Sequence, residues 1–225
     1  MLLALETAND QCSVVLYDGH GIRARRFDAR AREQTRLLLP MIDEVLAETG
    51  CALADLSAIA FSRGPGSFSG VRINAAVTQA LAWAHDLPVI PISTLQALAQ
   101  AAHEQQGLTD VVAVLDARMN EVYAAAYQQD ATGLMQPLGA EQLAGYAAVQ
   151  LPPAAVLAGS GVDLVQADGI VARYRDVAAN ADQIARLGWA ALQAGLTVSA
   201  AQALPVYLRD DAWKKLEAQR ALKGS

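Results

Sequence analysis

A glycine-rich stretch contains the residues of this chain that are best suited to chemistry. Residues 63–74 read RGPGSFSGVRIN. Glycine permits a close approach of the backbone, Pro65 fixes a bend, and Ser67 or Ser69 can cap a helix expected to begin near Val71. Backbone N–H groups at such a helix start attract anions, so the stretch is a candidate anion or nucleotide loop. Its members are Gly64, Pro65, Gly66, Ser67, Phe68, Gly70 and Arg72.

The same glycines have a simpler explanation. They can serve only the geometry of a turn between a strand and a helix, and the loop by itself favours that interpretation. It is not a Walker loop, because no lysine follows the glycines. Its serines also lack the G-x-S-x-G spacing of a hydrolase nucleophile.

Other reactive side chains are sparse. Phosphoryl transfer needs carboxylates that hold Mg²⁺, and Glu6 and Asp116 end the first predicted strand of each half of the chain. Most acidic residues lie on the surface, so both are interpreted as solvated. The histidines are far apart in sequence and do not form the His-x-x-x-His pair that a helix needs to share a metal ion. We therefore predict no catalytic residue, no metal site and no cofactor.

The first half of the chain has the predicted order βββ-α-β-α-β-α. Three short strands occupy residues 2–6, 12–17 and 22–28, and helical periodicity follows over residues 32–48, with Gly50 as the stop and Pro40 as a kink or break. Strands at residues 56–62 and 87–92 alternate with helices at residues 71–84 and 94–105, the last capped by Ser93. This order is typical of ribonuclease-H-like and actin-like ATPase (ASKHA) folds.

The second half is predicted to repeat the first in weaker form. Strands are expected at residues 110–117, 121–128, 134–138 and 155–158, with helices near residues 141–149 and 182–194. We therefore predict an α/β protein of two βββαβαβα lobes, covering residues 1–105 and 106–225. The last segment of the chain is expected to pack back on the first lobe, and its end, from Glu217, to be a frayed helix or disordered.

Composition describes a globular protein with an acidic balance. Of the 225 residues, 53% are hydrophobic and 18% charged, and the formal net charge is −6. No apolar run approaches the roughly 20 residues of a membrane-spanning helix, so a cytoplasmic protein is expected. Nucleic-acid phosphates attract clusters of Lys and Arg. An acidic chain is therefore expected to contact nucleic acid only through another subunit.

Four segments together resemble one protein family. The sequence GPGSFSGVRI resembles the GPGSFTGLRIG signature of the TsaB (YeaZ) family. The family's first hairpin resembles ANDQCSVVLYD of this chain. Its Asp-Ala-Arg…Glu-Val-Tyr stretch resembles LDARMNEVYAAAY, and its C-terminal segment resembles PVYLRDDAWKK. The departures are Ser69 for Thr, Asn74 for Gly and Glu6 for Asp, and Asn74 is expected to alter how closely a partner helix approaches.

The resemblance implies an actin-like fold and a role in making threonylcarbamoyladenosine in tRNA. It implies a non-catalytic subunit that forms a heterodimer with TsaD, which transfers the threonylcarbamoyl group to adenosine 37 of tRNAs reading ANN codons. It also implies that the subunit recruits the ATPase TsaE, and that it forms a homodimer when TsaD is absent.

Two helices of the first half are candidates for the partner surface. An amphipathic helix can cover its own sheet or a partner, and the sequence does not separate the two. The resemblance favours the partner, since the family pairs through this region. The candidate interface residues are Leu37, Leu38, Met41, Ile42, Val45, Ile73, Val77 and Leu81.

Alternative functions stay open at this point. One is a small-molecule kinase or ATPase of the actin-like class. Another is a glycoprotease-like regulator or inhibitor of a related protein. A ribonuclease-H-type nuclease is disfavoured, because a carboxylate cluster is not evident in the sequence.

Overall fold

The first lobe is built on a five-stranded sheet. A computed structural model describes residues 1–30 and 32–209, so the prediction for the end of the chain from Glu217 lies outside the described residues. The strands are β1 (Leu2–Glu6), β2 (Cys12–Tyr17), β3 (Ile22–Asp28), β4 (Ala58–Ser62) and β5 (Val89–Ile92), in the order β3-β2-β1-β4-β5. The first three strands are antiparallel, and β4 and β5 run parallel to β1. The predicted bounds of β1, β2 and β3 are confirmed.

Three helices follow the strands in the predicted order: α1 (Gln34–Thr49), α2 (Phe68–Ala84) and α3 (Thr94–Gln106). Gly50 ends α1 in the left-handed conformation, and Ser93 caps α3 by accepting from two backbone N–H groups. Helix α1 runs through Pro40 without the predicted break, because Pro40 lies on the exposed side, where water can satisfy the freed carbonyl. Helix α2 begins one turn earlier than predicted.

The second lobe contains β6 (Asp110–Asp116), β7 (Glu121–Gln129), β8 (Met135–Pro137), β9 (Gln142–Gly145), β10 (Ala155–Ala158) and β11 (Ile170–Tyr174). Its sheet has the order β11-β10-β6-β7-β8, and β9 pairs with β7. The helix predicted near residues 141–149 is wrong. Gln142–Gly145 form β9 instead, because they pair with Glu121–Ala124 and satisfy backbone groups of β7, and residues 146–148 form a turn.

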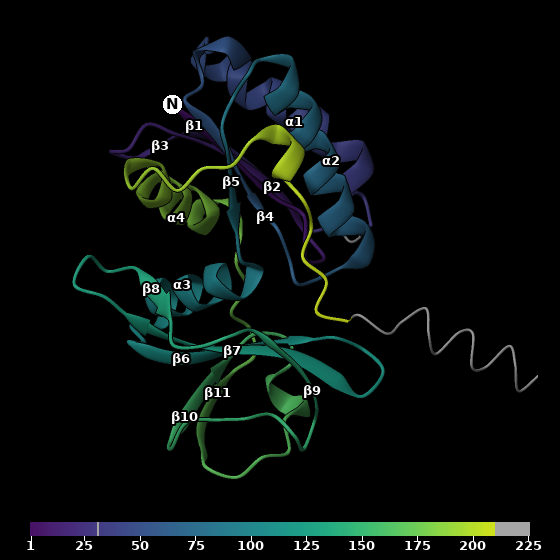
Figure 1. Cartoon of the computed structure of the whole chain (residues 1–225), viewed down its shortest axis with the longest axis vertical. Coiled ribbons are helices and arrows are strands. Elements are labelled where there is room, and N and C mark those ends of the chain that lie inside the picture. Colours follow the sequence, from purple (N-terminus) through teal and green to yellow (C-terminus); the bar gives the residue numbers. More distant parts are fainter. Residues whose placement is uncertain (31, 210–225) are drawn as a thin grey trace, which may run out of the picture.

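The two sheets share a core. Helices α1 and α2 cover one face of the first sheet, and α4 (Ala181–Gln193) covers the other (Figure 1). Helix α3 lies between the lobes and contacts β6 and β7. One hydrophobic cluster therefore joins the lobes, with members such as Leu2, Leu98, Val111 and Ile184. The division near residue 105 remains a prediction.

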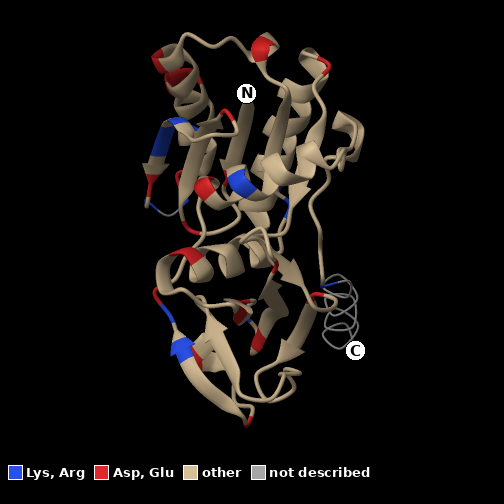
Figure 2. Ribbon diagram, turned by 90° about the vertical axis from the view of Figure 1, so that its left-hand side faces the viewer, with Lys and Arg blue, Asp and Glu red and all other residues tan. Residues whose placement is uncertain are grey.

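Charge is spread over both lobes. Acidic and basic residues are interspersed along the ribbon (Figure 2), and several pair with each other, as Arg26 does with Glu44 and Glu48. Within residues 1–30 and 32–209, no helix is long and apolar enough to cross a membrane.

Candidate functional site

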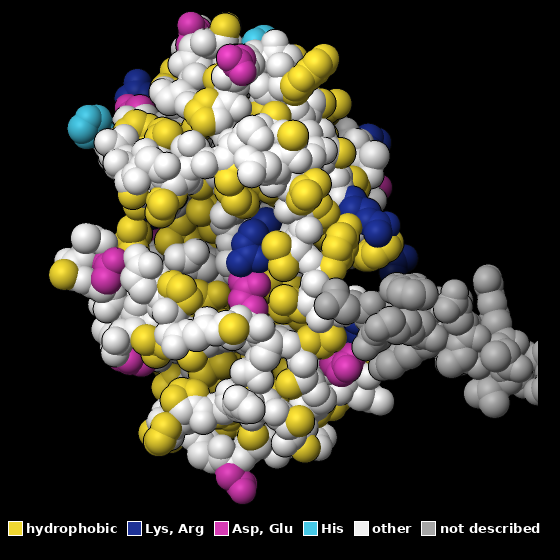
Figure 3. All heavy atoms as spheres, in the orientation of Figure 1, with side chains coloured by type: hydrophobic (Ala, Val, Ile, Leu, Met, Phe, Trp, Pro, Cys, Tyr) yellow, Lys and Arg dark blue, Asp and Glu magenta, His cyan; other side chains and the backbone are white. Residues whose placement is uncertain are grey.

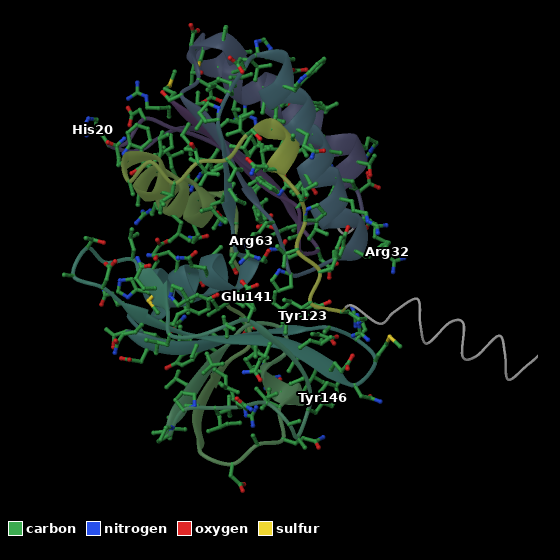
Figure 4. All side chains as sticks on the ribbon, in the orientation of Figure 1. His20, Arg32, Arg63, Tyr123, Glu141 and Tyr146 are labelled. Carbon is green, nitrogen blue, oxygen red and sulfur yellow. The ribbon has the colours of Figure 1, made fainter. Side chains whose placement is uncertain are left out.

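A cleft of about 1000 Å³ lies between the lobes. On the first lobe it is lined by the β1–β2 turn and by the start of α2. On the second lobe it is lined by the end of β6 and by Tyr123, which Figure 4 labels. Polar residues at its walls include Asn9, Gln11, Ser67, Asp116, Arg118, Ser160 and Arg209.

The glycine-rich loop packs directly on the β1–β2 turn. The Ser67 N–H donates to the Ala8 carbonyl at 2.6 Å, and the Thr7 hydroxyl donates to the Gly70 carbonyl at 2.8 Å. A Cβ atom at Gly66 would lie 2.2 Å from the Ala8 oxygen, and one at Gly70 would lie 1.9 Å from the Thr7 oxygen. Both glycines are thus needed for the contact between two backbones. An anion at this loop stays a prediction.

Ser67 explains why α2 starts early. Its side chain accepts from the Gly70 N–H at 3.4 Å, as the residue before the first helical position. Phe68, which was predicted to belong to the loop, is therefore the first residue of the helix and projects into solvent.

Glu6 lies at the end of β1, but it is not solvated. Its side chain is fully buried, which corrects the prediction of a surface acid. Burial raises its pKa to about 7, and nearby hydrogen-bond donors offset this only in part. One carboxyl oxygen accepts from the Ala8 N–H at 2.6 Å, and the other has no hydrogen-bond partner. Asp116, by contrast, is half-exposed and pairs with Arg118 at 2.9 Å.

Asn74 is also fully buried, which puts its side chain out of reach of a partner helix and corrects the expectation that it alters how closely such a helix approaches. Its amide donates to the Leu5 carbonyl at 3.1 Å, the Ser62 carbonyl at 3.2 Å and the Ser62 hydroxyl at 2.8 Å. The side chain points inward because Asn74 belongs to the stripe of α2 that packs on the sheet. It fastens α2 to β1 and β4.

Amide side chains join the β1–β2 turn to the strand–helix connection before α4. Asn9 donates to the Ala179 carbonyl at 3.0 Å, and Gln11 donates to the same oxygen. Gln34 is buried and donates to the Asn9 carbonyl at 3.0 Å. These contacts fix the turn that forms one wall of the cleft.

An ion pair also connects the two lobes. Arg63 and Glu141 face each other across the gap between the lobes (Figure 4), with two donor–acceptor pairs at 3.0 and 3.2 Å. Ser93 also donates to Glu141. The sequence reasoning missed Glu141, because 78 residues separate it from Arg63 and no local pattern marks such a pair.

The candidate interface residues fall into two groups. Leu38, Met41, Ile42 and Val45 are buried in the protein's own core, so their assignment to a partner surface is wrong in this conformation. The side of α1 that carries them packs on the sheet, which the helical period could not reveal. Leu37, Ile73, Val77 and Leu81 are half-buried at the edge of that core, and their role remains a prediction.

Large exposed side chains that the sequence reasoning missed lie on the same helices. Leu39 is 50% exposed, and Trp83 is 82% exposed. A signal existed for Trp83. It is a large aromatic residue that falls outside the buried stripe of Val71, Ala75, Thr78 and Ala82.

Two mixed α/β lobes with a cleft between them define a protein of the actin-like (ASKHA) fold class, as predicted. The second lobe departs from the predicted βββαβαβα order, because β6 to β11 follow one another without an intervening α-helix. The family model described as TsaD, tRNA N6-adenosine threonylcarbamoyltransferase, matches residues 28–214. The tRNA threonylcarbamoyladenosine biosynthesis protein TsaB of Escherichia coli (strain K12) is 39% identical over 96% of this chain and 97% of its own length. The chain belongs to the TsaB (YeaZ) family, which acts in the biosynthesis of threonylcarbamoyladenosine in tRNA.

Further similarity supports this membership. The TsaB protein of Haemophilus influenzae is 53% identical over 123 residues, which cover 54% of this chain and 51% of that protein. The solved structure of YeaZ from Pseudomonas aeruginosa has a TM-score of 0.86 at 38% identity, covering 92% of this chain and 99% of that one.

Proposed function

We propose that the chain is a non-catalytic subunit that supports threonylcarbamoyl transfer to adenosine 37 of tRNAs reading ANN codons. It pairs with TsaD, which carries out the transfer, and helps to recruit the ATPase TsaE. The observation that carries this proposal is the outward side of α2. Apolar side chains remain accessible there after the inward side has been buried on the sheet.

The partner surface is centred on one stripe of α2. Ile73, Val77 and Leu81 follow one another at intervals of four residues, which places them on one side of the helix. Ala80 and Ala84 add small exposed residues that let a partner helix approach closely. The match to the TsaD model suggests a partner of related fold, so helices of similar shape can pack against each other.

The surroundings of Glu6 support a non-catalytic role. Glu6 ends the first strand of the lobe but lies beneath the backbone of its own turn, and the start of α2 covers Thr7 and Ala8. A carboxyl group that is sealed from the cleft cannot hold a metal-bound nucleotide there. The proposal therefore assigns the transfer chemistry to TsaD.

Two further interactions follow, one with tRNA and one with a second copy of this chain. The net charge of −6 disfavours direct binding of a polyanion, so the complex, and chiefly the partner, contacts the tRNA. In the absence of TsaD, the same stripe of α2 pairs two copies of this chain as a homodimer.

Co-purification tests the pairing. Val77→Asp and Leu81→Asp place a charge in the stripe and should abolish capture of TsaD, whereas Val171→Asp, at an exposed apolar position of β11, should leave it unchanged. In a reconstituted system, omission of this chain should prevent formation of the modified nucleoside. Normal capture by both stripe variants contradicts the surface. Tight binding and turnover of ATP–Mg²⁺ by the isolated chain favour the kinase or ATPase alternative.

A further inference from the structure

A C-terminal segment joins the two lobes. Residues 203–209, here termed the strap, run from beside α2 down to the second lobe (Figure 1). Ala203 is buried in the hydrophobic cluster that also contains side chains of α1 and α2. Farther along, the Val206 N–H donates to the Arg63 carbonyl at 2.8 Å. The strap is thus anchored on the first lobe before it reaches the second.

Tyr207 of the strap organises the first turns of α2. Its hydroxyl accepts from the Arg72 Nε at 2.8 Å, and its ring centre lies 6.2 Å from that of Phe68. The Arg72 guanidinium lies 3.5 Å from the centre of the Phe68 ring. Phe68 is nevertheless 63% exposed and Tyr207 44% exposed. The three side chains form an ordered group on the surface.

Arg209 fastens the other end of the strap to the turn between β6 and β7. Its guanidinium donates to the Ala117 carbonyl at 3.1 Å and lies 2.6 Å from a Glu121 carboxyl oxygen. It also contacts the sulfur of Met119 at 3.2 Å. The Arg209 side chain is only 17% exposed, while Met119 is 68% exposed. The strap therefore contacts an exposed apolar side chain of the second lobe.

These contacts make one continuous surface. Phe68 touches Tyr207, which lies two residues before Arg209, and Arg209 touches Met119. Figure 3 shows hydrophobic and basic side chains close together in this region, beside the grey residues. Trp83 lies on the same side of α2 as Phe68 and Arg72, at helical spacing. At about 100° per residue, this side and the stripe of Ile73, Val77 and Leu81 are the two flanks of the exposed face of α2. The small exposed residues Ala76 and Ala80 lie between them. Aromatic residues, Met and Arg are the types enriched at protein interfaces.

We propose that the partner surface extends from α2 along the strap to Met119, so that TsaD contacts both lobes. Tyr207 and Arg209 hold the strap, and with it this surface, in position. This inference rests on the proposed pairing with TsaD. Arg72 favours an acidic patch on the partner, because among residues 1–30 and 32–209 it has contacts with Phe68 and Tyr207 and no acidic partner. A partner that contacts both lobes fixes the angle between them.

Affinity measurements with purified TsaD test the extension. Met119→Asp should weaken binding about tenfold or more, whereas Val171→Asp, an equally exposed apolar position on the same lobe, should change it less than about twofold. If Met119→Asp binds like the wild type while Val77→Asp does not bind, the extension is wrong and the pairing stands. If both variants bind like the wild type, both proposals fail.

Hydrogen exchange of the free protein tests the strap itself. Arg209→Ala should speed exchange roughly fivefold at residues 117–121 and also at residues 68–72, because a strap released at one end no longer holds the other. Arg175→Ala removes an exposed arginine that pairs with Asp163, and should change neither region. Faster exchange confined to residues 117–121, or none at all, would show that the strap does not position the surface.

Discussion

Arg63 of the first lobe and Glu141 of the second form a two-point ion pair, with nitrogen–oxygen distances of 3.0 and 3.2 Å. The side chains are 25% and 12% exposed, so water screens the pair only partly. The pair lies at the junction of the lobes and receives a third hydrogen bond, from Ser93. The Arg63–Glu141 pair therefore stabilises the contact between the two lobes and is not an ordinary surface ion pair.

Arg63→Ala should lower the free energy of unfolding by about 2 kcal/mol, because it leaves the largely buried Glu141 carboxylate without its cationic partner. Thermal or denaturant unfolding measures the change. Arg36→Ala is the control, because Arg36 forms an exposed pair with Glu33 and should cost less than about 1 kcal/mol. Equal losses of unfolding free energy in the two variants would mean that the Arg63–Glu141 pair stabilises the protein no more than an exposed ion pair does.

Glu6→Gln should remove a pH dependence of stability. The folded protein keeps the Glu6 proton up to about pH 7, whereas the unfolded chain releases it near the ordinary pKa of 4.5. Between these values the folded state binds more protons, so stability falls as pH rises, by about 3 kcal/mol in all. The glutamine variant should match the wild type at pH 4.5 and exceed it in stability at pH 8.

Denaturant unfolding at a series of pH values checks this expectation. Asp10→Asn alters an exposed carboxyl group in the same turn and should retain the wild-type pH dependence. A wild-type stability that rises between pH 5 and pH 7, with no change of slope in Glu6→Gln, contradicts a buried neutral Glu6.

Gly70→Ala should destabilise the protein by roughly 3 kcal/mol, because the new Cβ atom would lie 1.9 Å from the Thr7 oxygen and push α2 away from the turn. Gly139→Ala is the matched control, since a Cβ atom there meets nothing within 4 Å. Unfolding free energies of the two variants settle the point. A well-tolerated Gly70→Ala would disprove the close backbone contact.

Asn74→Ala should cost about 2 kcal/mol, because it removes the hydrogen bonds that the Asn74 amide donates to Leu5 and Ser62 in the buried interface between α2 and the sheet. The affinity for TsaD should stay within about twofold, since Asn74 is fully buried and faces away from any partner. Calorimetric unfolding and a binding titration measure the two effects separately. A large loss of affinity in a folded variant would show that Asn74 influences the partner surface after all.

The sequence by itself determined most of the first lobe. A short apolar run indicated β1, an alternating segment rich in β-branched residues indicated β2, and a glycine turn indicated the start of β3. Ser93 and Gly50 marked helix ends. All of these are local properties of the chain. The four family segments indicated the TsaB family for the same reason, since each is a short continuous pattern.

Only the tertiary structure decided which side of each helix is free. Leu38 and Val77 both occupy apolar positions of amphipathic helices, yet Leu38 is buried and Val77 reaches solvent. The burial of Glu6, the pairing of Arg63 with Glu141 and the strand β9 likewise depend on segments that are distant in the chain. Such contacts follow from how whole sheets and helices pack, and local periodicity does not contain that information.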